Sequence, residues 1–355
     1  MADEILFMDG FEHYADDDIF KKYDGFQVSD IYFNANVTTS PRFTAASTAN
    51  AYMTVTPNNG SNGSHLTKTI ITTDDTVTIG MALRVESATG GFDEDFAHLG
   101  VASDNNYYRI ILNGSGEIKV LAGGTTVTTT TTFGMSNAVW TFVEVEIKQS
   151  TSGTGYVKVY KNGTLNHTFN GITDIDAHAE DFAQAGVCYN FRPTLVGGHG
   201  LSEYDDLYIK NDTFLGDVRV ITLIPNAAGA FTDFTPLSGS NHSNVDEIDD
   251  IDEDSSYVEN GSVGARELYN IDTFTSTPTT IHGVQLNVVS KKTDATERKY
   301  VPMLYVSATQ YDGTEITLDS SYKDNLEVWN QNPNTSTAWT VSDIGSLQIG
   351  FRVTA

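Results

Sequence analysis

The chain has 355 residues, of which 47 are acidic and 20 are basic, so its formal net charge is −27. Nucleic-acid binding depends on lysine and arginine side chains that neutralise phosphates, so this charge excludes nucleic acid and argues against insertion into anionic membranes. Apolar residues make up 39% of the chain, as in folded proteins, and the length favours two domains over one.

The N-terminus lacks the pattern of a secretory signal. No basic residue precedes its apolar run 5–8, and Asp9 ends that run, so we expect a chain made in the cytoplasm without a cleaved signal peptide. No stretch of about 18 apolar residues occurs that could form a membrane-spanning helix. The lone Cys188 cannot form an internal disulfide or a multi-cysteine zinc site. Its apolar surroundings favour a packed side chain over a nucleophile.

Alternation with period two dominates the first 212 residues and predicts β-strands. The clearest example is residues 76–86, where every second side chain is apolar. The positions predicted to face the core are Val77, Ile79, Met81, Leu83 and Val85. The positions predicted to face away are Thr78, Gly80, Ala82 and Arg84. Met81→Asp is therefore expected to unfold the domain, whereas Arg84→Asp is expected to be mild.

Residues 141–148 and 156–161 alternate in the same way and are followed by Asn162-Gly163. Asn-Gly between two such runs predicts a hairpin with a type I′ turn, because both residues tolerate positive φ. The return strand is expected over 164–169. Further strands are predicted at 107–112, 117–121, 185–189 and 207–210, an edge strand or loop at 128–132, and one short helix at 174–184.

The strand pattern pauses near Asn211 and resumes at Gly216. We therefore predict two domains, residues 1–212 and residues 213–355, that fold separately. In the second domain a loop-like segment over 226–260 precedes strands at 281–289, 300–307 and 347–353. The predicted fold class is all-β, with two β-sandwich, jelly-roll-like domains in tandem.

Paired carboxylates are the first enzymatic hypothesis, because glycoside hydrolysis uses two of them beside the scissile bond. Glu144 and Glu146 lie two apart on one strand and share a face. Glu203, Asp205 and Asp206 are similar to part of the acidic strand motif of β-sandwich glucanases. That motif needs a further glutamate, and residues 207–209 are Leu, Tyr and Ile. Solvated strand faces are the preferred interpretation, and no catalytic residue is assigned.

The acidic run 246–254 could hold Ca²⁺, which takes clustered carboxylate oxygens as ligands. Alignment to a helix-loop-helix calcium loop fails, because Ser255 stands at the position of the glycine and Gly261 at that of the last glutamate. A solvated loop is the default prediction, with an irregular calcium site or an intersubunit contact as alternatives.

Other motifs for catalysis or ligand binding are missing. The closest histidines, His167 and His178, are eleven apart, no HExxH or GxSxG occurs, and Gly197–Gly200 lacks the Lys-Ser/Thr of a phosphate loop. No metal ligand and no cofactor are predicted. Aromatic residues are frequent in the strand patterns, and such rings either stack on sugars or fill a core. They include Tyr107, Tyr108, Trp140, Tyr156, Tyr160, Tyr189, Tyr208, Trp329 and Trp339.

Three passages of the first half resemble concanavalin A-like, laminin-G-type jelly rolls of bacteriophage virion proteins: 6–11, 140–163 and 204–209. The second half resembles the domain that follows such jelly rolls in tailed-phage structural proteins. Its matching passages are 214–220, 244–247, 256–258 and 339–341. The resemblance is architectural, and no catalytic, cofactor-binding or metal-binding residue is carried over from it.

The resemblance implies a non-enzymatic structural component of a tailed-phage virion, associated with the tail as a minor tail, fibre or tip protein. The partners it implies are other virion proteins, a host cell-surface glycan, and further copies of the chain in a homo-oligomer. A capsid decoration protein is one alternative. A polysaccharide-degrading enzyme of concanavalin A-like fold is another, and two carboxylates at catalytic separation would distinguish it.

Overall fold

The structure is a computed structural model. It describes residues 4–13, 18–23, 25–27, 31–33, 53–55, 65–72, 76–85, 93–101, 106–113, 117–122, 125–126, 131–136, 138–148, 153–172, 187–191, 194–196, 202–248, 251–274 and 277–355. The chain divides into two compact units. Unit 1 comprises Met1–Phe11, Tyr23–Arg42 and Ala51–Val220, and unit 2 comprises Glu12–Lys22, Phe43–Asn50 and Ile221–Ala355.

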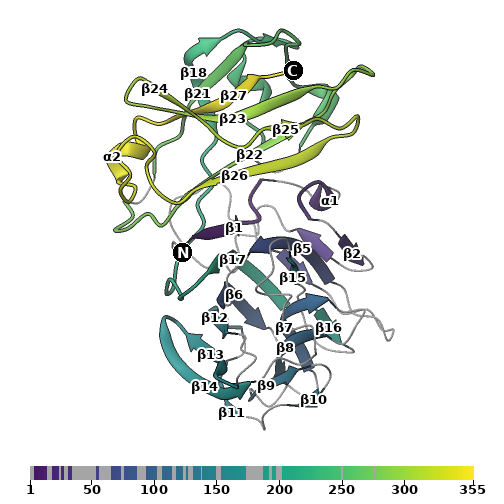
Figure 1. The fold of residues 1–355 in the computed structure, drawn as a ribbon, viewed down its shortest axis with the longest axis vertical. Coiled ribbons are helices and arrows are strands. Elements are labelled where there is room, and N and C mark those ends of the chain that lie inside the picture. The colour runs from purple at the N-terminus through teal and green to yellow at the C-terminus, as the bar shows by residue number, and fades with distance from the viewer. Residues whose placement is uncertain are drawn as a thin grey trace. The chain divides into compact units, whose positions relative to one another are not determined.

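Unit 1 contains two antiparallel sheets (Figure 1). Sheet 1 has the order β14-β13-β12-β6-β17-β4-β3, with β1 paired to β17. Its strands are β1 (Ile5–Asp9), β3 (Ile31–Phe33), β4 (Met53–Val55), β6 (Thr76–Val85), β12 (Thr141–Lys148), β13 (Gly155–Lys161), β14 (Thr164–Ile172) and β17 (Ser202–Asn211).

Sheet 2 has the order β10-β9-β8-β7-β16-β5-β15, with β11 paired to β9 and β2 to β5. Its strands are β2 (Gly25–Gln27), β5 (His65–Thr72), β7 (Asp93–Val101), β8 (Asn106–Asn113), β9 (Glu117–Ala122), β10 (Thr125–Thr126), β11 (Thr131–Thr132), β15 (Val187–Phe191) and β16 (Thr194–Val196). The strands predicted by alternation are therefore confirmed, including those near 107–112, 117–121 and 185–189. The predicted helix at 174–184 and the glycine segment 197–200 lie outside the described residues.

The hairpin predicted at Asn162-Gly163 is confirmed between β13 and β14. Both residues have positive φ, 49° and 72°, as a type I′ turn requires. The turn is also tied to β12, because the Asn162 backbone N–H donates to the Phe142 carbonyl oxygen and the Phe142 N–H donates to Asn162 Oδ1, each at 2.8 Å. The turn thereby fixes the start of β12 against β13.

The core face of sheet 1 is the predicted one. Val77, Ile79, Met81 and Leu83 of β6 are fully buried, and so are the alternate apolar residues of the paired strands β12 and β13. Those are Val143, Val145, Ile147, Val157 and Val159. Thr78, Gly80, Ala82 and Arg84 alternate with these residues and lie on the opposite face, as predicted, but they are buried as well. Sheet 1 is covered on both faces along β6 and β12.

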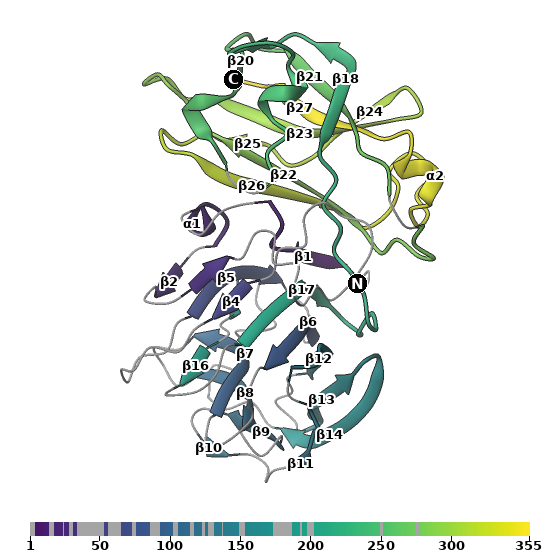
Figure 2. The ribbon, with the colours of Figure 1, turned by 180° about the vertical axis from the view of Figure 1, so that it is seen from behind.

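Unit 2 is also all-β (Figure 2). Its main sheet has the order β18-β21-β27-β23-β24, with β25 paired to β23, and two further pairs are β22-β26 and β19-β20. The strands are β18 (Pro225–Thr232), β19 (Thr235–Pro236), β20 (Val258–Glu259), β21 (Arg266–Ile271), β22 (Val284–Ser290), β23 (Lys299–Val306), β24 (Thr309–Asp312), β25 (Ile316–Thr317), β26 (Lys323–Trp329) and β27 (Gln348–Val353).

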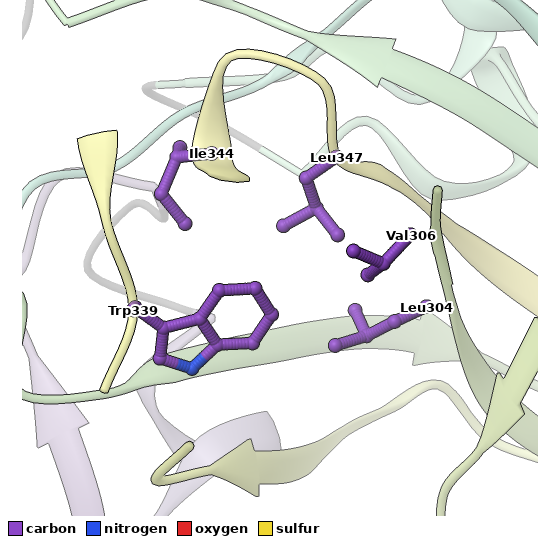
Figure 3. Close-up of a cluster of buried hydrophobic side chains, with 5 residues drawn as sticks. All are labelled: Leu304, Val306, Trp339, Ile344 and Leu347. Atoms are coloured by element: carbon purple, nitrogen blue, oxygen red, sulfur yellow. The ribbon is translucent and has the colours of Figure 1, made fainter. Parts of the chain in front are cut away.

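Short helices complete unit 2: α1 (Ile19–Lys22), α2 (Val341–Ile344), and the 3₁₀ turns His242–Asn244 and Glu253–Ser255. One buried cluster packs α2 onto the strands (Figure 3). It consists of Leu304, Val306, Trp339, Ile344 and Leu347. The indole N–H of Trp339 donates to the Trp329 carbonyl oxygen at 2.8 Å, so this buried donor is satisfied.

The prediction of a loop over 226–260 is wrong at its start, where β18 forms the edge of the main sheet. Its sequence PNAAGAFT lacks alternating large apolar residues, and every second side chain is exposed, so hydrophobic periodicity did not reveal it. Gly229 allows the close approach of β21, because a Cβ there would lie 2.6 Å from the Leu268 carbonyl oxygen. The all-β, tandem β-sandwich prediction is nonetheless confirmed. Among the described residues, no helix is long and apolar enough to cross a membrane.

Candidate functional site

The face of sheet 1 opposite its core, here called the outer face, carries a dense group of charged and phenolic side chains. Alternation that sends valine and isoleucine into the core sends charged and phenolic side chains to the other side. Register then aligns them across four neighbouring strands. The outer-face residues are Thr78, Gly80, Ala82 and Arg84 on β6, Phe142, Glu144 and Glu146 on β12, Tyr156, Lys158 and Tyr160 on β13, and Glu203, Tyr208 and Lys210 on β17.

Glu144 is fully buried at the centre of this face. Its Oε1 accepts hydrogen bonds from the Tyr208 hydroxyl at 2.5 Å and from the backbone N–H groups of Leu215 at 3.1 Å and Gly216 at 2.8 Å. Its Oε2 is buried and has no hydrogen-bond partner. Burial raises the pKa of Glu144, and this effect outweighs the three hydrogen bonds, which act in the opposite direction.

Glu146 is buried two residues further along β12 and has different surroundings. Its Oε1 accepts from the Tyr156 hydroxyl at 2.6 Å and from Lys158 Nζ at 2.7 Å, and its Oε2 accepts from the Tyr160 hydroxyl at 3.0 Å. Burial and the hydrogen bond to Glu146 raise the pKa of both tyrosines, so their phenols remain hydrogen-bond donors. Lys158 Nζ also lies 4.1 Å from the centroid of the Tyr156 ring.

The contact between Tyr208 and Glu144 depends on a glycine. Gly80 of β6 lies between them in the sheet, paired to both residues. A Cβ at position 80 would lie 2.2 Å from Tyr208 Cε1, so only glycine lets the ring lie across the sheet and reach Glu144.

The third carboxylate of the face is neutralised by an ion pair. Arg84 Nη1 donates to Glu203 Oε2, and Arg84 Nε donates to the Ala138 carbonyl oxygen at 3.2 Å. Both side chains are buried. Asp206, in the same acidic stretch, adopts a φ of 54° where the register of β17 shifts against β6, and its Oδ1 accepts from the Val220 N–H at 2.7 Å. The acidic stretch therefore contributes an ion pair and a bulge.

Residues 213–220, here called the strap, follow β17 and return across the outer face. At one end Lys210 Nζ donates to the Thr213 carbonyl oxygen. Phe214 stacks on Tyr160 with ring centroids 3.8 Å apart. Leu215 and Val218 pack against the buried cluster Ala82, Phe142 and Tyr208, to which Met8 and Trp140 also contribute. The strap and its partners belong to unit 1.

The arrangement combines two carboxyl groups of unlike environment with three tyrosines. One carboxyl is desolvated and retains an unused oxygen, while the other is paired with an ammonium group. Pairs of titratable groups with different surroundings are the usual basis for separate acid and base roles. The expectation that Glu144 and Glu146 lie on a solvated strand face is wrong.

The other predicted positions do not join this face. In the acidic run of unit 2, two carboxylates pair with lysines: Lys21 Nζ lies 2.6 Å from Glu253 Oε1, and Lys291 Nζ lies 2.6 Å from Asp254 Oδ1. The Ser256 hydroxyl is within hydrogen-bond distance of Glu247 and Asp252. Asp249 and Asp250 lie outside the described residues. Within the part of the chain that is described, no group of three or more His, Cys, Asp or Glu side chains could hold a metal ion.

Sequence reasoning identified Glu144 and Glu146 but missed the groups that define their environment. Tyr156, Tyr160 and Tyr208 follow the same alternation as the two glutamates, and this pattern could have placed them together. The glycine at position 80, inside an otherwise regular strand, was a second usable signal, because such a glycine marks a close approach of another group. In the strap, the alternation that resumes at Gly216 predicted a strand, but residues 213–224 form none, so this signal did not reveal the contact with Glu144.

Comparison with known proteins gives matches among solved structures only. No protein-family model and no curated protein matches the chain. An endo-β-1,4-glucuronan lyase from Trichoderma reesei has 15% identity over 59% of this chain and 96% of its own, with a TM-score of 0.40. The alginate lyase of Aplysia kurodai has 10% identity over 59% of this chain and 100% of its own, with a TM-score of 0.42. The lectin-like defence protein arcelin-5 of Phaseolus vulgaris has 12% identity over 54% of this chain and 96% of its own, with a TM-score of 0.34.

These neighbours share 10 to 15% identity with the chain, at TM-scores of 0.34 to 0.42. At such low identities the likeness concerns the fold alone. The prediction that the chain is not an enzyme is contradicted here, because polysaccharide lyases stand among the structural neighbours.

Proposed function

We propose that unit 1 is a polysaccharide-degrading enzyme that cleaves glycosidic bonds of a neutral glycan on the outer face of sheet 1. The observation that carries this proposal is the pair Glu144 and Glu146, buried side by side on β12 under three phenol groups. Residues two apart on a strand have Cα atoms about 6.7 Å apart. Carboxyl pairs that flank a scissile glycosidic bond are separated by roughly 5 to 9.5 Å.

Glu144 takes the role of general acid. Burial raises its pKa, so it retains its proton at a higher pH than an exposed glutamate and can donate it to the leaving oxygen. Its Oε2, which is buried without a partner, is the oxygen left for the substrate. Tyr208, held on Oε1 at 2.5 Å, fixes the orientation of the carboxyl group.

Glu146 takes the role of the second carboxylate, which activates water or attacks the sugar. Its negative charge is balanced by the ammonium group of Lys158 at 2.7 Å. The hydroxyls of Tyr156 and Tyr160 hold its two oxygens in place. The rings of these tyrosines supply apolar area on which a pyranose can stack.

A neutral glycan fits this face better than a polyuronate. Binding of a uronate requires a cation that can turn to the ligand carboxylate, and the cations here already contact acceptors of the protein. Lys158 contacts Glu146, Arg84 contacts Glu203, and Lys210 contacts the Thr213 carbonyl oxygen. The net charge of −27 repels polyanions in addition.

The test is release of reducing ends from laminarin, lichenan, hydroxyethylcellulose and dextran, with alginate as the anionic comparison. Wild type should release reducing ends from at least one neutral polymer, and Glu144→Gln and Glu146→Gln should each lower the rate by about 10²-fold or more. Glu4→Gln, at an exposed glutamate of unit 1, is the control and should retain the wild-type rate. Equal rates in all four proteins, or no release from any neutral polymer, would refute the proposed function.

A place in a tailed-phage virion, among other virion proteins and as a homo-oligomer, remains a prediction from the sequence resemblance. Labelling of the protein on imaged particles would test it.

A further inference from the structure

We infer that the strap, residues 213–220, is an internal pseudo-ligand that occupies the glycan site and must be displaced before a glycan binds. The inference rests on the proposed function and adds its regulation. It is drawn from contacts within unit 1, where the strap covers the two groups that a sugar would use first, the ring of Tyr160 and the carboxyl group of Glu144.

The first contact is aromatic. Phe214 stacks on Tyr160 with centroids 3.8 Å apart and an interplanar angle of 25°. This is the position that a pyranose ring takes on an aromatic platform, with an apolar face laid flat on the ring. Tyr160 cannot stack on a sugar on this side while Phe214 is in place.

The second contact is polar. The N–H groups of Leu215 and Gly216 donate to Oε1 of Glu144, as the hydroxyl groups of a bound sugar would. Gly216 has a φ of 94°, a conformation that favours glycine. Its N–H and that of Leu215 end on the same carboxyl oxygen. Open space surrounds the position where a Cβ would lie.

The way the strap is held allows it to leave. Residues 213–216 lie outside every strand of the described sheets, and the N–H bonds that hold the centre of the strap end on the side chains of Glu144 and Tyr208. Segments outside the sheets open locally at a lower free energy than core strands. The two ends are anchored separately, Thr213 by Lys210 and Val220 by Asp206. Displacement of the centre therefore has to release the Phe214 stack and the packing of Leu215, while the ends stay fixed.

Two variants of the full chain test this inference in opposite directions. Phe214→Ala removes the stacked ring and should tighten binding of the neutral polymer by between about two- and tenfold in affinity electrophoresis. Gly163→Cys with Asp217→Cys, in a Cys188→Ser background, should lock the strap, because a Cβ on Gly163 would lie 3.6 Å from the Asp217 backbone nitrogen. The oxidised form should lose binding and the reduced form should regain it.

Hydrogen exchange supplies a readout that depends on neither variant. The polymer to add is the neutral one that retards the protein most in affinity electrophoresis. It should speed up exchange of the Leu215 and Gly216 amides, because the polymer takes their place on Glu144. Gly264→Ala is the control for a side chain placed at a glycine of positive φ. Gly264 has a φ of 91° in unit 2 and no atom lies within 4 Å of its Cβ position, so the change should leave glycan binding unchanged.

The outcomes separate the two proposals. If wild type binds a neutral polymer, but the oxidised lock and Phe214→Ala bind it equally well and amide exchange in the strap slows or does not change, the pseudo-ligand inference is wrong and the proposed function stands. If no neutral polymer binds to wild type, to Phe214→Ala or to the reduced lock, the proposed function fails and the inference fails with it.

Discussion

Glu144 is a carboxyl group whose surroundings favour the protonated form. Since its folded-state pKa lies above the ordinary value of 4.5, the stability it supports is present below that value and is lost as the pH rises through the folded pKa. Glu144→Gln keeps an acceptor for the three donors and removes the charge. We expect its melting temperature at pH 7 to equal or exceed that of wild type. As the pH rises from 4 to 7, its melting temperature should fall less than that of wild type. Parallel pH profiles of the two proteins would contradict this.

Gly80 is the residue on which the geometry of Glu144 depends. Gly80→Ala places a Cβ 2.2 Å from Tyr208 Cε1 and pushes the ring off the sheet, at an expected cost of about 1 to 3 kcal/mol in the free energy of unfolding. Tyr208→Phe removes only the hydroxyl that donates to Glu144. A double-mutant cycle by denaturant unfolding should show that Tyr208→Phe costs little in the Gly80→Ala background. Full additivity would mean that Gly80 does not position the hydroxyl.

Arg84 corrects the sequence-based expectation that Arg84→Asp is mild. The side chain is only 10% exposed and pairs with Glu203, so an aspartate there would lie beside a buried glutamate with no cation. We expect Arg84→Asp to destabilise unit 1 by about 3 to 5 kcal/mol. Arg84→Met combined with Glu203→Leu removes both charges and should recover most of that loss in thermal unfolding. A mild effect of Arg84→Asp alone would contradict the buried pair.

At the scale of elements, the sequence predicted those parts of the fold that depend on local periodicity. The strands β6, β12 and β13 and the hairpin at Asn162 follow from alternation and from the tolerance of Asn-Gly for positive φ. The edge strand β18 was not predictable in this way, because its alanines and glycine carry little hydrophobic contrast.

The candidate site shows the same division. Alternation indicated that Glu144 and Glu146 share a face, but burial of that face depends on residues 213–220, which are about 70 positions away along the chain. A single-sequence pattern contains no information on such a contact. The solvated interpretation failed for this reason.

Helix α1 illustrates a long-range contact with a testable consequence. It belongs to unit 2, where Lys21 pairs with Glu253 and Asp18 Oδ2 accepts from the Ile251 N–H at 3.1 Å. A fragment of residues 213–355 lacks this segment. We expect a peptide of residues 12–22 to raise the melting temperature of that fragment, and the same peptide with Lys21→Glu to have a smaller effect. No difference between the two peptides would contradict a contribution from the ion pair.

At the scale of the whole molecule, the two proposals together make the outer face of sheet 1 a glycan site that is closed by its own strap. Ten of the thirteen residues of this face carry a charge or a hydroxyl, and eight of these ten are buried, which is costly unless each group is hydrogen-bonded. The contacts of Glu146, Arg84 and Tyr208 meet that requirement, and Oε2 of Glu144 is left without a partner.

The most direct test is a crystal structure of Glu144→Gln with a neutral oligosaccharide that wild type cleaves or binds. We expect a sugar ring stacked on Tyr160 in the position of Phe214, a sugar hydroxyl on the side chain at position 144, and residues 214–216 displaced from the sheet. An oligosaccharide bound away from β12 and β13, with Phe214 still stacked on Tyr160, would contradict a glycan site on the outer face that the strap closes.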